Sequence, residues 1–176
     1  MINNLIRIYA LRDYPNRANE CRELLLKHFN EFVSEHPAQV LASTGTFPQG
    51  YFMLKNDTVI GWTGLHEKEA VSGRVFGWAG SLEKEEVICD DLSPWITPLL
   101  IHPNERGHHY GKLLLDYARK EAGMMGFKYV YLTTDHIGYY EKYGFREVGL
   151  TTFTWGRPTK VYEHDTIGEV RVTTND

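Results

Sequence analysis

Short hydrophobic runs and stretches of alternating hydrophobic and polar residues predict seven strands along the chain. The dipeptide Asn56-Asp57 separates the second and third stretches, and such a pair is typical of a two-residue hairpin turn. A second hairpin is expected around Gly156-Arg157-Pro158, near the end of the chain. The predicted strands are residues 5–11, 51–55, 58–65, 96–101, 129–133, 145–155 and 159–167.

Three segments instead space their hydrophobic residues by three and four positions, as helices do. The first follows Asn16, a candidate N-cap, and ends near His36-Pro37; its apolar face comprises Cys21, Leu25, Phe29, Phe32 and Val33. The second begins near Tyr110 and places Leu114, Tyr117, Ala118, Ala122 and Met125 on one face. The third is short, residues 136–143, and Gly144 stands where a C′ glycine is expected.

Residues 66–93 show no clear period, because glycines at positions 73, 77 and 80 interrupt them. This segment also holds five acidic residues against one lysine between positions 81 and 91. We expect a solvated loop or a short helix here. A functional alternative is that the acidic side chains attract a cationic amine; they are Glu83, Glu85, Glu86, Asp90 and Asp91.

The order strand-helix-strand-strand-strand-helix-strand-helix-strand-strand predicts an α/β fold, with a mixed central sheet and helices on both of its faces. A length of 176 residues fits a single domain spanning residues 1–176.

Composition narrows the classes of partner. A net charge of −4 without a basic run argues against nucleic acid and anionic membranes, and no apolar run approaches the length of a membrane span. No signal peptide is indicated, and the two cysteines, Cys21 and Cys89, are too few for a disulfide scaffold, so we expect a cytoplasmic protein with free thiols. His102, His108 and His109 lack the spacing of a zinc site, so no metal is expected.

The stretch 95–115 joins a buried strand to a helix through a turn that contains glycine. Free N–H groups and the partial positive charge at a helix start make an anion site, to which Arg106 and Lys112 add full charges. The expected ligand is a phosphate or pyrophosphate. The turn matches neither the P-loop of nucleotide hydrolases nor the G-x-G-x-x-G dinucleotide fingerprint.

This turn resembles the pyrophosphate loop [Q/R]-x-x-G-x-[G/A] of the GNAT superfamily of acyl-CoA N-acyltransferases. Arg106 takes its first position and Gly111 its last, whereas His109 replaces the middle glycine. A second signature of the superfamily, aromatic-Tyr-x-x-x-Gly-Phe, falls on residues 139–145. The "Pro-Trp-hydrophobic" segment before the strand resembles a bacterial-type branch of the superfamily.

The resemblance implies a fold, a cofactor and a reaction. It implies acetyl-CoA as acyl donor, a primary amine as acceptor, and direct attack on the thioester in a ternary complex. Tyr140 would be the general acid that protonates the leaving thiolate, because a phenol stays protonated at neutral pH. The residues expected to bind the cofactor are Leu99, Leu100, Ile101, Arg106, Gly107, His108, His109, Tyr110, Gly111, Lys112 and Tyr140.

The general base stays open between His66, Glu67, Asp135, His136 and a water chain, because the superfamily's asparagine before the short helix is missing here. The acceptor is left open between a small-molecule amine and a peptide amine, and a homodimer is neither indicated nor excluded. An alternative function is a CoA-binding sensor or regulatory module that kept the fold and lost turnover.

Overall fold

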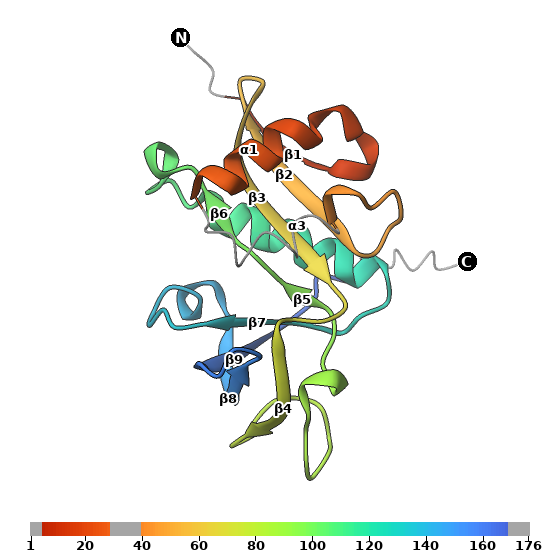
Figure 1. Ribbon diagram of the computed structural model, residues 1–176, viewed down its shortest axis with the longest axis vertical. Helices are drawn as coiled ribbons and strands as arrows, with labels where there is room; N and C mark the ends of the chain where they lie inside the picture. The colour runs from red at the N-terminus through yellow and green to blue at the C-terminus, as the bar shows by residue number, and fades with distance from the viewer. Residues whose placement is uncertain (1–4, 29–39, 169–176) are drawn as a thin grey trace, which may run out of the picture.

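The computed structural model describes residues 5–28 and 40–168, and these residues build a twisted mixed sheet (Figure 1). The strand order is β1-β2-β3-β5-β7-β9-β8-β4, with β6 pairing separately with β3. The nine strands found in the described part are β1 Ile6–Ala10, β2 Gln49–Lys55, β3 Thr58–His66, β4 Val71–Phe76, β5 Trp95–Ile96, β6 Leu100–Ile101, β7 Tyr129–Thr134, β8 Arg146–Phe153 and β9 Pro158–Asp165.

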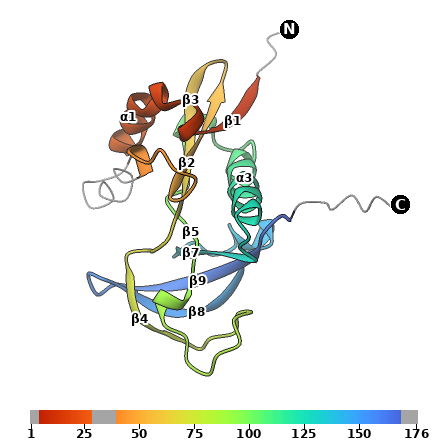
Figure 2. The ribbon, with the colours of Figure 1, turned by 90° about the vertical axis from the view of Figure 1, so that its right-hand side faces the viewer.

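Two helices cover opposite faces of the N-terminal half of this sheet, as Figure 2 shows. They are α1 (Ala18–His28) on one face and α3 (Tyr110–Met124) on the other. Short 3₁₀ turns complete the chain: Leu11–Asp13, Pro15–Arg17, Cys89–Asp91, Pro103–Glu105 and Glu141–Tyr143. The predicted α/β architecture, with a mixed sheet and helices on both faces, is confirmed.

The alternation along β2 explains how one sheet serves both helices. Successive side chains of a strand point to opposite faces. Phe52 accordingly packs in a cluster with Leu24 and Leu25 of α1, whereas its neighbour Tyr51 packs with Leu115 of α3. All of these side chains are buried, so each face of the sheet contributes a separate hydrophobic layer.

Strand register breaks in the middle of the sheet. The expected single strand 96–101 is two short strands, β5 and β6, because the chain leaves the ladder at Thr97, Pro98 and Leu99. Proline lacks the N–H that a central strand needs. Among described residues, β5 pairs with β7 in parallel only at Trp95 and Tyr131, so β6 and β7 diverge beyond that point. This opening between two strands is termed the seam below.

The prediction of a loop or short helix over residues 66–93 is wrong for its first part. Residues 71–76 form β4, which pairs with β8 across a register shift between Ser72 and Phe76. Gly73 inside the shift has φ +80°, so the glycine that hid the alternation is a bulge residue. Val75 is buried and carries the strand's packing.

Two helix boundaries also differ from prediction. The first helix begins at Ala18 after a 3₁₀ turn that contains Asn16, so Asn16 is not its N-cap. The rest of this predicted helix from residue 29 onward, including Phe29, Phe32 and Val33, lies outside the described residues. The expected helix 136–143 is one 3₁₀ turn, Glu141–Tyr143, although Gly144 ends it with φ +91° as predicted.

Both predicted hairpins are confirmed. Asn56 and Asp57 have φ of 49° and 73°, the conformation of a two-residue turn between β2 and β3. Gly156, at φ +93°, lies in the turn between β8 and β9. Within the part of the chain that is described, no helix combines the length and the hydropathy needed to cross a bilayer.

Candidate active site

A pocket of about 360 Å³ lies where the start of α3 meets the turn that precedes β8. The two segments that carry the sequence signatures therefore face one another, although some thirty residues separate them in the chain. The lining comprises Leu99, Ile101, Glu105, Arg106, Gly107, His109, Tyr110, Gly111, His136, Tyr139, Tyr140, Lys142 and Tyr143.

The start of α3 has the geometry of an anion site. His109 occupies the N-cap position with φ 60° and ψ 25°, and its side chain makes no capping hydrogen bond. The N–H groups of the first helical turn lack intrahelical partners, so they are available to a ligand. A left-handed backbone favours glycine, but histidine is one of the residues that also adopt it. His109 thus has the backbone conformation of a glycine at the position where the GNAT pyrophosphate loop has one.

The charges around this helix start favour an anion. Arg106 donates from Nε to the Ile101 carbonyl at 3.2 Å, which fixes the exposed side chain at the mouth of the pocket. Lys142 brings a second cation, because its Nζ lies over the ring of Tyr139 at 4.6 Å. Glu105 is the acidic residue of the lining, and it pairs with Lys55 at 2.8 Å, which offsets its charge.

Aromatic rings form the wall opposite α3. Tyr139 contacts the rings of Tyr140 and Tyr143 edge-on, with centroids 4.9 and 5.5 Å apart. Its hydroxyl reaches back to α3, where a Cβ atom on Gly111 would lie only 2.3 Å from it. Glycine at position 111 therefore allows the aromatic wall to close against the helix.

Tyr140 lines the pocket from within this wall. Its ring also packs against Phe145, with centroids 5.9 Å apart. Burial raises the pKa of Tyr140 above that of an ordinary phenol, and Tyr139 beside it adds to the effect. The hydroxyl thus stays protonated throughout the neutral range and has a proton to donate.

Most of the residues predicted to bind the cofactor line the pocket, and a few do not. Eight of the eleven lie on the pocket: Leu99, Ile101, Arg106, Gly107, His109, Tyr110, Gly111 and Tyr140. Leu100 packs on the opposite face with Phe52 and Trp62. Lys112 pairs with Asp116 along the helix, and neither it nor His108 contributes to the lining.

The candidate general bases also differ in whether they line the pocket. His136 lines the pocket with its ring centroid 6.3 Å from that of Tyr139. Asp135 pairs with Arg157 and accepts a hydrogen bond from Thr159, so it is held at the hairpin instead. His66 is a buried residue at the end of β3, exposed Glu67 follows it, and neither lines the pocket.

Four residues of this pocket were not predicted as part of the site: Glu105, Tyr139, Lys142 and Tyr143. A signal was present for the last three, because they lie inside the aromatic-Tyr-x-x-x-Gly-Phe signature. The Lys112–Asp116 pair was also readable from its i, i+4 spacing.

The seam is a second feature of the site. β6 pairs with β3 on one side, while its other edge faces the opening toward β7. Backbone groups along an open strand edge can bind an extended ligand that carries amides.

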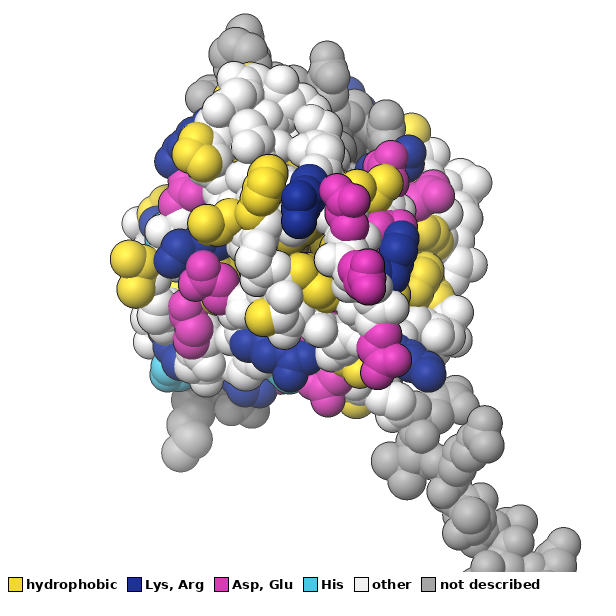
Figure 3. All heavy atoms as spheres, turned by 90° about the horizontal axis from the view of Figure 1, so that it is seen from below, with side chains coloured by type: hydrophobic (Ala, Val, Ile, Leu, Met, Phe, Trp, Pro, Cys, Tyr) yellow, Lys and Arg dark blue, Asp and Glu magenta, His cyan; other side chains and the backbone are white. Residues whose placement is uncertain are grey.

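The acidic residues of the 83–91 segment are largely engaged locally. Asp91 pairs with Lys84 at 2.8 Å and accepts the Ile88 N–H at 3.0 Å. Seen from below, the end of the molecule that carries β4 and β8 intersperses acidic side chains with basic and hydrophobic ones (Figure 3). The visible face thus shows no acidic patch.

Comparison with known proteins agrees with this arrangement. The model of the acetyltransferase (GNAT) family matches residues 11–145. Among solved structures, the aminoglycoside 6'-N-acetyltransferase from Enterococcus faecium aligns with 94% of this chain and 98% of its own, at 16% identity and TM-score 0.64. No match was found among curated protein sequences.

Two further structures are similar and carry the relevant ligands. An aminoglycoside 6'-N-acetyltransferase complexed with coenzyme A aligns at TM-score 0.63 and 15% identity, over 94% of this chain and 98% of its own. A GNAT family acetyltransferase from Brucella melitensis, in complex with acetyl-CoA, aligns at TM-score 0.58 and 15% identity, over 94% of each chain. At these identities the likeness establishes the fold.

Proposed function

Because this chain belongs to the acetyltransferase (GNAT) family, we propose that it is an N-acetyltransferase that moves an acetyl group from acetyl-CoA to a primary amine. The observation that carries the proposal is the pocket itself. It combines an uncapped helix start with the half-buried phenol of Tyr140, so one end suits a pyrophosphate and the other a leaving thiolate.

The donor would lie along the seam. Residues 106–111 would hold the pyrophosphate through the helix N–H groups and the charge of Arg106, with Lys142 beside them. The backbone of residues 99–101 would pair with the pantetheine amides, and one N–H there would polarise the thioester carbonyl. Acetyl-CoA supplies the activated acyl group.

The transfer we propose is direct. The amine nitrogen bonds to the thioester carbonyl carbon, the carbon–sulfur bond breaks, and the thiolate takes a proton from Tyr140. The amine loses its extra proton to a base, for which His136 is the candidate inside the pocket, either directly or through water. Both cysteines are buried outside the lining, which favours a ternary complex over an acyl-enzyme.

The acceptor we propose is a small-molecule amine. Two of the similar structures are aminoglycoside acetyltransferases, and this supports a small polyamine over a peptide amine. The general class, acetyl transfer, rests on the family; the acceptor and the use of acetyl-CoA are the parts to be tested.

The test combines binding with turnover. Acetyl-CoA is titrated into the protein by calorimetry, and thiol release is followed with a panel of small amines and peptides. Tyr140→Phe should lower kcat about a hundredfold, the size expected for a general acid, with little change in affinity for acetyl-CoA. Tyr9→Phe, a matched change on β1 away from the pocket, should leave both unchanged.

Two results would contradict the proposal. A protein that binds acetyl-CoA but releases no thiol with any amine would instead be a CoA-binding module without turnover. A protein that fails to bind acetyl-CoA would remove the basis for both functions.

A further inference from the structure

His164 on β9 lies behind the turn that carries the tyrosines of the pocket, and it is mostly buried, with 14% of its side chain exposed. Its ring packs edge-on against Phe145, with centroids 4.9 Å apart. A Cβ atom on Gly144 would lie 2.6 Å from Nε2, so the turn rests directly on the imidazole.

Both ring nitrogens of His164 face acceptors. Nε2 lies 3.1 Å from the Tyr143 carbonyl oxygen, and Nδ1 lies 2.5 Å from a carboxylate oxygen of Asp165. A carbonyl only accepts, so the bond to Tyr143 requires a proton on Nε2. With the proton there, a neutral ring satisfies Tyr143, whereas a bond to Asp165 as well needs a second proton on Nδ1.

The second proton is weakly held. Burial lowers the pKa of His164 and the nearby guanidinium of Arg119 lowers it further, while Asp165 opposes both. Arg146 and Glu163, which lie in the same hollow beside β9, pair with each other. In the neutral ring that carries its proton on Nε2, the bond to Tyr143 is kept.

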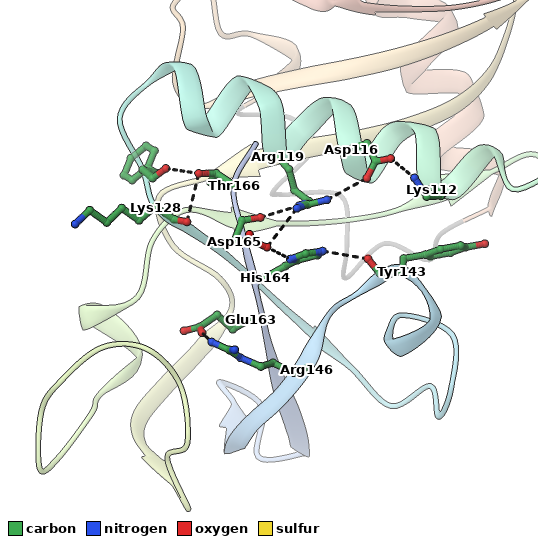
Figure 4. A network of polar contacts seen from close by, with 11 residues as sticks. Lys112, Asp116, Arg119, Lys128, Tyr143, Arg146, Glu163, His164, Asp165 and Thr166 are labelled. Atoms are coloured by element: carbon green, nitrogen blue, oxygen red, sulfur yellow. Dashed lines mark hydrogen bonds and ion pairs between the residues drawn. The ribbon is translucent and has the colours of Figure 1, made fainter. Parts of the chain in front are cut away.

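These contacts continue to the start of α3 by two routes, and Figure 4 draws the one that runs through Arg119. On one side, the Tyr143 hydroxyl meets Nδ1 of His109 at 3.0 Å, at the N-cap of α3. On the other side, Arg119 of α3 links Asp165, at 3.4 Å, to Asp116, at 3.2 Å, and Asp116 pairs with Lys112. His164 is the point at which the turn, β9 and α3 are joined.

We propose that His164 is a positioning residue: through the Tyr143 carbonyl it holds the turn with Tyr140 and Tyr143 against the start of α3, and so sets the width of the donor pocket. The effect of this role on catalysis rests on the proposed function. Its structural content, a contact from His164 on β9 to the Tyr143 carbonyl in the turn, stands independently of the ligand.

Two variants of His164 each keep one of its two polar contacts. In His164→Gln the amide nitrogen takes the place of Nε2 and keeps the bond to Tyr143. In His164→Asn it takes the place of Nδ1 and keeps only the Asp165 contact. We expect Asn to weaken acetyl-CoA binding and raise KM about tenfold, the loss of roughly one buried hydrogen bond, while Gln stays within about threefold of wild type.

Hydrogen exchange supplies a readout that needs no ligand. The amides of Gly144 and Phe145, bonded to the carbonyls of Glu141 and Tyr140, should exchange about tenfold faster in the Asn variant and near the wild-type rate in the Gln variant. Equal behaviour of the two variants in exchange would overturn the proposal. If wild type binds no acetyl-CoA, the proposed function fails, and the exchange rates still decide the role of His164.

Discussion

Gly111→Ala tests how the aromatic wall meets α3. A Cβ atom at this position would lie 2.3 Å from the Tyr139 hydroxyl, about 1.1 Å inside the 3.4 Å at which ordinary contacts begin. The GNAT pyrophosphate loop, which this turn resembles, has glycine or alanine at this position. In this chain Tyr139 leaves room for glycine alone. The ring cannot yield independently, because it packs edge-on against Tyr140 and Tyr143.

The magnitude follows from the overlap. Forcing an extra methyl into a packed site costs about 1–3 kcal/mol, and Ala in a helix returns about 0.5–1 kcal/mol relative to Gly. We expect a net loss near 1–2 kcal/mol, which lowers Tm by about 2–8 °C at this size. The displaced wall also changes the shape of the donor pocket, so affinity for acetyl-CoA should fall about tenfold.

A second change isolates the cause. In Tyr139→Phe the hydroxyl is absent, and the nearest ring atom, Cζ, would lie 3.6 Å from the new Cβ, an ordinary contact. The double variant should therefore recover the stability and the affinity that Gly111→Ala loses, as a double-mutant cycle measured by thermal melts and calorimetry. Unchanged melting of Gly111→Ala, or a double variant no better than the single one, would refute the steric argument.

Two further changes probe other parts of the fold. Glu121→Gln should lower the free energy of unfolding by about 3 kcal/mol in urea titrations, because Glu121 is buried and pairs with Arg12 at 3.0 Å; a loss below about 0.5 kcal/mol would contradict this. The hydrogen bonds from Lys84 and from the Ile88 N–H lower the pKa of Asp91, so its contribution to stability is present above the unfolded-state pKa and is lost as pH falls through the lower folded value. Acid titration of Asp91→Asn should show a flatter loss of stability below about pH 4 than wild type, and an identical acid limb would contradict the assignment.

Local signals in the sequence were sufficient for the elements that build the pocket. Helix α3 was predicted because Leu114, Ala118 and Ala122 share one face, and all three are buried. The position of the turn before β8 followed from Gly144, whose left-handed conformation ends it. These features depend on neighbours within a few residues, and such neighbours are visible in a sequence.

Features that depend on distant partners were not predictable in this way. Strand β4 was missed because its register shift places Gly73 inside the strand, and only the pairing with β8 reveals it as a bulge. The cations of the pocket were expected to be Arg106 and Lys112, whereas the lining holds Arg106 and Lys142, because the direction of a lysine depends on which charges and rings surround it. His164 gave no signal, since its partners come from α3 and the turn.

The seam gives the sheet an unusual mechanical character. Among described residues, the two halves share strand pairing only at Trp95 and Tyr131, and α3 spans the gap by packing on Leu65 from one half and on Val130 from the other. Here the two halves are joined by that one residue pair and by the packing of α3 across them. An acyl donor lying in the seam would take the place of the missing strand pairing, so the bound molecule would itself connect the two halves of the sheet.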